Sequence, residues 1–154
     1  MRHYTSYKTP YSIRESDWTY LGRAYYEVGN FPEARRALEK ALADDKDDSL
    51  ARLYLGLTLL RSGDQQGGRR ETEAGLKGVN NLLNRLASSP SSGIYFDPTR
   101  QIRTDIQQAL STTDTLESSE LITVGERIGK RLDEEIDDAR LDESRDKYNR
   151  TGDM

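Results

Sequence analysis

The sequence contains no cysteine and a single histidine, His3. Without thiols the chain can form no disulfide framework, thiolate zinc site or cysteine nucleophile. One histidine near the N-terminus cannot build a Ser-His-Asp triad or a polyhistidine metal site. Aromatic residues are also scarce, at 8%, while charged residues reach 32% and hydrophobic residues only 34% of the 154 positions. This length and composition predict one domain made of thin helical layers, because a thick β-sheet core needs more apolar side chains.

Positive charge and long apolar runs are missing as well. The formal net charge is -4, which argues against a nucleic-acid or anionic-membrane surface, since phosphates are neutralised by clustered Lys and Arg. No stretch resembles a membrane span, and residues 1–14 do not resemble a secretory leader. We therefore expect no nucleic-acid partner, no membrane span and a cytoplasmic location. A periplasmic or exported location is the alternative if an N-terminal signal has been removed.

The first half of the chain carries an internal repeat. An offset of 34 residues aligns two segments without a gap and pairs identical residues: Tyr20 with Tyr54, Leu21 with Leu55, Gly22 with Gly56, Gly29 with Gly63, Arg35 with Arg69, Arg36 with Arg70, Glu39 with Glu73 and Leu42 with Leu76. A period of this length is typical of a stacked supersecondary unit.

Each copy of the repeat predicts two helices. In the first copy, Ser16 caps a helix that ends at Gly29, and Pro32 opens the next helix. The stripe expected to be buried on that first helix comprises Trp18, Leu21, Tyr25 and Val28. The last helix of the second copy contains four glycines, Gly67, Gly68, Gly75 and Gly78, which weaken a helix. We therefore expect close helix packing to require small residues there.

These residues resemble a known family. Trp18, Leu21, Gly22, Tyr25, Ala34 and Ala41 stand at the spacings of the tetratricopeptide repeat, and Leu55, Gly56 and Leu59 repeat that pattern. The chain departs from the family at Arg52, where an aromatic residue is usual, and at Lys46, where the first unit lacks the closing proline. The resemblance covers residues 15–82. It implies an all-α fold, a right-handed stack of antiparallel helical hairpins, and a protein-binding role without chemistry of its own.

In such a stack the first helices of the repeats face a concave surface where partners bind. The resemblance therefore places a protein or peptide partner of unknown identity on nine residues: Thr19, Arg23, Tyr26, Glu27, Leu50, Leu53, Leu57, Leu60 and Arg61. The leucines would form an exposed apolar patch unless something covered them. Thr19, Leu53 and Leu57 do not supply the Lys, Asn and Arg clamp by which some family members hold acidic chaperone tails, which argues against that partner.

The second half of the chain predicts further helices. We expect two repeat units with an extended last helix over residues 15–88, a linker over 89–96 and a C-terminal helical hairpin over 97–148 that packs on the repeats, with tails at 1–14 and 149–154. Asp97 and Pro98 open the first helix of this hairpin, and the final helix runs from about Ser118 to Tyr148. Our hypothesis is that this final helix crosses the leucine patch, because burying one leucine contributes about 1.5 to 3 kcal/mol. Capping the end of the stack and pairing with a second molecule are the alternatives.

Three further clusters allow a functional and a structural interpretation. In each case we favour the structural interpretation. We expect a solvated helix face at the acidic run of Asp133, Glu134, Glu135, Asp137 and Asp138. We expect the arginines to pair with nearby glutamates at Arg35, Arg36, Arg69 and Arg70, and we expect an anchor for the returning chain at Ile94, Tyr95 and Phe96.

The sequence thus predicts a non-enzymatic protein–protein interaction or scaffold module whose groove is partly filled by its own C-terminal helix. The alternative is a structural homo-oligomeric subunit that self-associates through the Leu50, Leu53, Leu57 and Leu60 surface. No nucleophile, base and pocket can be assembled from these residues, so we expect neither catalysis nor a bound metal or cofactor.

Overall fold

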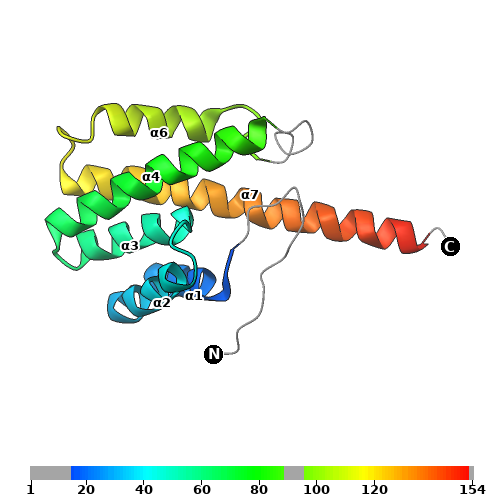
Figure 1. Ribbon diagram of the computed structural model, residues 1–154, viewed down its shortest axis with the longest axis horizontal. Coiled ribbons are helices and arrows are strands. Elements are labelled where there is room, and N and C mark those ends of the chain that lie inside the picture. Colours follow the sequence, from blue (N-terminus) through cyan, green and yellow to red (C-terminus); the bar gives the residue numbers. More distant parts are fainter. Residues whose placement is uncertain (1–14, 89–95, 153–154) are drawn as a thin grey trace.

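The computed structural model describes residues 15–88 and 96–152, with side chains described up to residue 138. This part of the chain is all-α, as predicted: it consists of six helices and contains no strand (Figure 1). The helices are α1 (Asp17–Glu27), α2 (Phe31–Asp44), α3 (Ser49–Arg61), α4 (Gln65–Ala87), α6 (Gln101–Ser111) and α7 (Ser118–Gly152). Within these ranges no helix is both long and apolar enough to cross a membrane.

The first four helices form two antiparallel hairpins, α1 with α2 and α3 with α4, and α2 packs on α3 (Figure 1). Each hairpin repeats the same local signals. The first helix of each is followed by a glycine with positive φ, 81° at Gly29 and 95° at Gly63. A side chain then caps the next helix, Asn30 for α2 and Asp64 for α4. The stripe predicted to be buried on α1 is shifted by about one residue: Trp18, Leu21 and Tyr25 are only partly buried and Val28, just after the helix end, is 78% exposed. The buried residues of α1 are Thr19, Gly22, Arg23 and Tyr26.

Helix α3 is the centre of the molecule, and ten of its thirteen residues are buried, from Leu50 to Leu60 apart from Arg52. It can be enclosed this tightly because α4 presents glycines to it. A Cβ atom at Gly75 would lie 2.5 Å from the backbone nitrogen of Leu53, and one at Gly68 would lie 2.6 Å from Cγ of Leu60. The expectation that packing requires small residues in α4 is thus confirmed.

Helix α6 begins later than predicted. Its first residue is Gln101, because Asp97 and Arg100 both have positive φ, 51° and 63°, and the chain turns between them. Asp97 nevertheless binds the helix start: its carboxylate accepts hydrogen bonds from the backbone N–H groups of Ile102, at 2.8 Å, and Arg103, at 3.1 Å. Phe96, immediately before this turn, is 1% exposed, whereas Ile94 and Tyr95 lie outside the described residues.

Helix α7 packs against α3, α4 and α6, and its C-terminal part extends past the other helices (Figure 1). Its predicted stripe includes four side chains that are 0 to 1% exposed, Leu121, Ile128, Leu132 and Ile136. The helix continues to Gly152, four residues beyond the predicted end at Tyr148, so residues 149–152 belong to a helix rather than to a tail. The predicted tail at 1–14 and most of the predicted linker lie outside the described residues.

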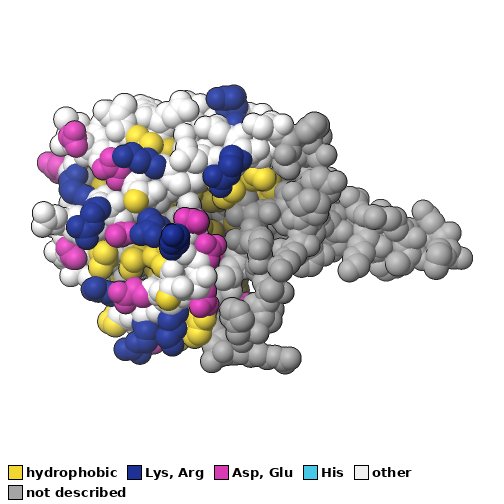
Figure 2. All heavy atoms as spheres, in the orientation of Figure 1, with side chains coloured by type: hydrophobic (Ala, Val, Ile, Leu, Met, Phe, Trp, Pro, Cys, Tyr) yellow, Lys and Arg dark blue, Asp and Glu magenta, His cyan; other side chains and the backbone are white. Residues whose placement is uncertain are grey.

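Of the four repeated arginines, the pair in the first unit behaves as predicted: Arg36 lies 2.7 Å from Glu33 and Arg35 lies 3.5 Å from Glu39. Arg69 does not. Its guanidinium donates to the carbonyl oxygens of Thr113, at 3.2 Å, and Leu116, at 2.5 Å, and so holds the turn between α6 and α7. On the face seen in Figure 2, Lys and Arg side chains are interspersed with Asp and Glu, so opposite charges partly cancel there.

Candidate functional site

The candidate site is the groove between α1 and α3, across which α7 lies. The four leucines over which we expect the final helix to cross are 0 to 4% exposed: Leu50, Leu53, Leu57 and Leu60. Leu57 faces α7, where a Cβ atom at Gly125 would lie 2.7 Å from its Cδ2 atom, whereas Leu53 and Leu60 pack on the glycines of α4. Positions three apart on a helix point in directions about 60° apart, so these leucines divide between two neighbours. Helix α7 thus packs on this leucine surface at Leu57, while α4 takes part in covering Leu53 and Leu60.

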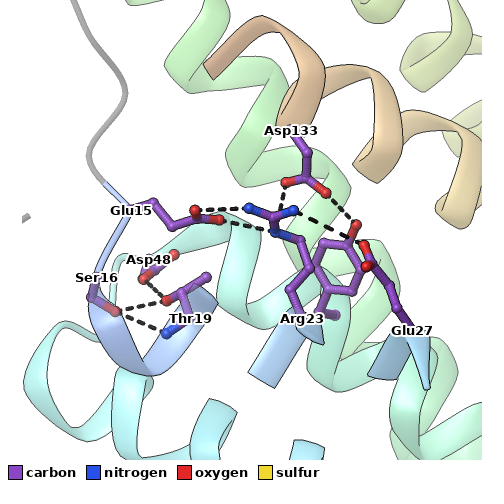
Figure 3. Close-up of polar contacts among 8 residues, drawn as sticks. Glu15, Ser16, Thr19, Arg23, Glu27, Asp48 and Asp133 are labelled. Atoms are coloured by element: carbon purple, nitrogen blue, oxygen red, sulfur yellow. Dashed lines mark hydrogen bonds and ion pairs between the residues drawn. The ribbon is translucent and has the colours of Figure 1, made fainter. Parts of the chain in front are cut away.

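The polar residues of the groove form a buried ionic cluster with α7 (Figure 3). Arg23 of α1 donates to both carboxylate oxygens of Glu15, at 2.9 Å and 3.2 Å. The same guanidinium lies 3.2 Å from Oδ1 of Asp133 on α7, and Tyr54 of α3 donates a 2.6 Å hydrogen bond to Oδ2 of that carboxylate. Glu15 is 2% exposed and Asp133 is 5% exposed, so both carboxylates are held away from water.

A second cluster of the same kind lies further along the groove. Tyr26 of α1 donates a 2.6 Å hydrogen bond to Oε2 of Glu126 on α7, and Arg61 of α3 donates to the same oxygen at 2.8 Å. Arg61 also donates to the Tyr26 hydroxyl, at 3.1 Å. The side chains of Arg61 and Glu126 remain 41% and 37% exposed, so this cluster is open to water on one side.

The buried cluster carries an excess of negative charge. Burial, reinforced by the charges of Glu15 and Glu27, raises the pKa of Asp133 to about 7, although Tyr54 and Arg23 act in the opposite direction. Burial alone would lower the pKa of Arg23, but its contacts with Glu15 and Asp133 raise that pKa above its ordinary value. Oδ1 of Asp133 is buried and accepts no hydrogen bond from the described residues. One guanidinium thus neutralises two buried carboxylates only in part.

This arrangement corrects the interpretation of the acidic run on α7. Glu134, Asp137 and Asp138 are exposed, as a solvated face requires, but Asp133 points into the groove. Glu135 is half-buried and accepts a 2.8 Å hydrogen bond from the backbone N–H of Asp97. The five carboxylates therefore belong to different environments, because an α-helix distributes consecutive residues around its whole circumference.

Two other predicted contact residues, Thr19 and Glu27, differ in their accessibility. Thr19 is fully buried, and its hydroxyl donates a 2.6 Å hydrogen bond to Asp48, the cap of α3, so it links the two repeats and is not available to a partner (Figure 3). Glu27 is accessible: its side chain is 60% exposed and lies 4.0 Å from Arg23.

The groove is not completely filled by α7. A cavity of about 610 Å³ remains open beside it, lined by Tyr26, Glu27, Gly29, Phe31, Tyr54, Arg61, Glu126 and Lys130. Its walls combine aromatic rings with charged groups of both signs, a lining that is typical of a ligand-binding pocket. Among residues 15–88 and 96–138, no group of three or more Asp, Glu or His side chains could hold a metal ion.

Several residues of this site were missed from the sequence: Glu15, Tyr54, Glu126 and Asp133. One signal could have revealed the two on α7. Glu126 and Asp133 are seven residues apart, which places them on one face of a helix, and Gly125 and Gly129 beside them indicate a close approach to another helix. Tyr54 is the counterpart of Tyr20 in the repeat, yet Tyr20 is 56% exposed and Tyr54 only 3%.

Comparison with known proteins is informative for the repeats alone. A family model described as tetratricopeptide repeat matches residues 21–77, which run from α1 into α4. No curated protein and no solved structure matches the chain.

Proposed function

Because residues 21–77 form tetratricopeptide repeats, we propose that this protein is a non-enzymatic protein-binding or scaffold module whose groove is partly filled by its own helix α7. The repeats act in general as interaction modules. The contacts that α1 and α3 make with α7 support two further parts of the proposal: partners bind in this groove, and α7 occupies it in their absence.

One observation carries the proposal: the polar groups of the groove are engaged by side chains that another helix brings to them. Tyr26 and Tyr54 each donate to a carboxylate of α7, and Arg23 and Arg61 each lie beside one. A surface that holds one helix through four directed polar contacts has the chemistry to hold a partner of similar shape. The open cavity beside Glu126 is where such a partner can first make contact.

The alternative of self-association through the four leucines requires α7 and α4 to move away, since these side chains are 0 to 4% exposed. Sedimentation velocity at several concentrations separates the two functions. We expect a monomer at all of them, whereas a dimer that grows with concentration favours the oligomeric subunit.

The binding function is tested by retrieving proteins from an extract of the protein's own cells with the full chain and three variants. Gly129→Leu opens the groove, because a Cβ atom at this position would lie 2.9 Å from the Tyr54 hydroxyl. Gly129→Leu with Arg61→Glu opens the groove and removes one of its cations. Arg35→Glu is the matched control, since Arg35 is a 53% exposed arginine on α2, outside the groove.

We expect Gly129→Leu to retrieve more of a specific protein than the unmodified chain does, the double variant to retrieve less, and Arg35→Glu to behave as the unmodified chain. Circular dichroism establishes that each variant is helical before retrieval. Equal retrieval by the two groove variants would show that the groove is not the binding surface. Gly129→Ala takes the place of Gly129→Leu if the larger residue prevents folding.

A further inference from the structure

We propose that the groove recognises an amphipathic helix of a partner protein that carries two carboxylates seven residues apart, and that α7 is the resident copy of this ligand. This inference rests on the proposed binding function and adds the chemistry of the partner. It follows from how the groove holds Glu126 and Asp133.

The groove contains two receptors of the same composition, each made of one tyrosine hydroxyl and one arginine. Tyr26 of α1 and Arg61 of α3 hold Glu126, with donor–acceptor distances of 2.6 Å and 2.8 Å. Tyr54 of α3 and Arg23 of α1 hold Asp133, at 2.6 Å and 3.2 Å. Each receptor thus takes one group from each repeat, so neither repeat alone forms a complete site. At Glu126 both donors meet the same oxygen, Oε2, and such a pair favours an anionic group. At Asp133 the hydroxyl meets Oδ2 and the guanidinium lies beside Oδ1.

The spacing of the receptors sets the spacing of the ligand. Tyr54 and Arg61 are seven residues apart on α3, and the carboxylates they hold are seven residues apart on α7. Seven residues span about two turns, or roughly 10 Å, and return to nearly the same face of a helix. A helix whose carboxylates are four residues apart reaches only one of the two receptors.

Small residues form the second part of the recognition pattern. Gly125 and Gly129 stand one residue before and three residues after Glu126, and added Cβ atoms would meet Leu57 Cδ2 at 2.7 Å and the Tyr54 hydroxyl at 2.9 Å. A partner helix with bulky residues at these positions is held too far from α3 for its carboxylates to reach the tyrosines.

The resident helix does not satisfy the groove completely, which leaves room for a replacement. Oδ1 of Asp133 accepts no hydrogen bond from the described residues, and Asp133 shares Arg23 with Glu15. Beside Glu126 the cavity of about 610 Å³ exposes Lys130 and Glu27 to a second ligand while α7 is in place. An acidic helix can therefore begin to bind at the Tyr26–Arg61 receptor, which is the water-exposed one.

The test uses designed helical peptides and the full chain carrying Gly129→Leu, or Gly129→Ala if the leucine variant does not fold. The matched peptide places small residues, Glu and Asp on an unrelated alanine-rich helix at the spacings of Gly125, Gly129, Glu126 and Asp133, with apolar residues at the spacings of Ile128, Leu132 and Ile136. One control peptide replaces the glutamate by glutamine. A second control moves the aspartate three residues closer to the glutamate, so that the spacing becomes four.

We expect the matched peptide to bind at least tenfold more tightly than either control in a fluorescence titration. Arg61→Glu in the same chain should abolish this difference, and a peptide with arginine in place of its glutamate should recover binding to that variant. Such an exchange of charge requires direct contact between position 61 and the ligand.

Equal binding of the matched and control peptides, or no binding to a folded variant, would overturn the inference. The inference would also be overturned if a peptide with the sequence of residues 118–138 bound and the designed peptide did not. The groove would then be specific for the sequence of α7, and the partner would be a second copy of this chain. These outcomes differ from failure of the proposed function. If retrieval from extract depends on Arg61 while the peptides fail, the binding function stands and the acidic helix does not.

Discussion

The hydroxyl of Tyr54 donates a 2.6 Å hydrogen bond to Asp133, a residue 79 positions later in the chain. Both side chains are buried, at 3% and 5% exposure. This bond ties the second repeat to α7, and it is the only hydrogen bond to the Asp133 carboxylate from the described residues. Tyr54 is therefore the residue that satisfies this buried carboxylate of α7.

Tyr54→Phe should destabilise the protein more than Tyr26→Phe does. Removal of the Tyr54 hydroxyl leaves a buried carboxylate without any hydrogen bond, and we expect a loss of about 1 to 3 kcal/mol in the free energy of unfolding. Tyr26→Phe is the matched control, because Glu126 keeps Arg61 and is 37% exposed, so water can replace the lost hydroxyl. Urea denaturation of the two variants checks the order, and a larger loss in Tyr26→Phe would contradict it.

Stability should fall as the pH rises through neutrality. The pKa of Asp133 is raised from an ordinary 3.8 to about 7 by burial, so the folded protein binds this proton more tightly than the unfolded chain does. The corresponding stability is fully present below the ordinary pKa and is lost as the pH rises through about 7. Between pH 5.5 and pH 8 we expect a loss of about 2 kcal/mol, measured by urea denaturation.

Asp133→Asn should remove this part of the pH dependence and make the protein more stable than the unmodified chain at pH 8. Glu134→Gln is the control, since Glu134 is the exposed neighbour of Asp133 and its replacement should leave the slope unchanged. The same slope in Asp133→Asn as in the unmodified chain would show that Asp133 does not titrate in this range.

The repeated hairpins could be predicted because their signals are local. Ser16, Pro32 and Gly29 mark helix ends through their own conformational preferences, and the offset of 34 residues is visible without any tertiary contact. The glycines of α4 indicated close packing for the same reason, since a helix contains several glycines only where their small size is needed.

The environment of Asp133 could not be predicted in this way. Its acidic neighbours suggested a solvated face, but burial depends on which helix lies opposite, and α1 and α3 are separated from α7 by more than fifty residues. Likewise, the division of Leu53 and Leu57 between two neighbours depends on the angle at which α4 and α7 approach α3. Such contacts join segments that are distant in the chain, so the local sequence signals do not predict which side chains they bury.

Gly75→Ala should destabilise the protein although alanine is the better helix former. The added Cβ atom would lie 2.5 Å from the backbone nitrogen of Leu53 and 2.6 Å from its Cα, so α3 and α4 must separate. Overpacking of this kind costs about 1 to 3 kcal/mol, and it outweighs a gain in helix propensity of about 1 kcal/mol.

The neighbouring position supplies the control for Gly75→Ala. Ala74 is exposed, so Ala74→Gly should cost about 1 kcal/mol through helix propensity alone. Both changes are measured by urea denaturation at one pH. A Gly75→Ala variant that is more stable than the unmodified chain would disprove the close approach of the two helices.

Asp97→Ala should be among the most destabilising single changes. Asp97 is 1% exposed, and its carboxylate binds the Arg103 guanidinium at 2.8 Å as well as two backbone N–H groups at the start of α6. Removal of the carboxylate leaves the 5% exposed Arg103 side chain without its anion, for which we expect a loss of about 3 to 5 kcal/mol.

Two further variants separate the charge of Asp97 from its other roles. Asp97→Ala combined with Arg103→Leu should recover part of the loss, because an apolar replacement of both partners removes the unpaired charge. Asp105→Ala is the control, since Asp105 pairs at 3.3 Å with Arg131, whose side chain is 43% exposed, and such pairs contribute less than about 1 kcal/mol. If urea denaturation gives equal losses for Asp97→Ala and Asp105→Ala, the buried pair does not hold the start of α6, and the turn at residues 97–100 must be stabilised by its backbone alone.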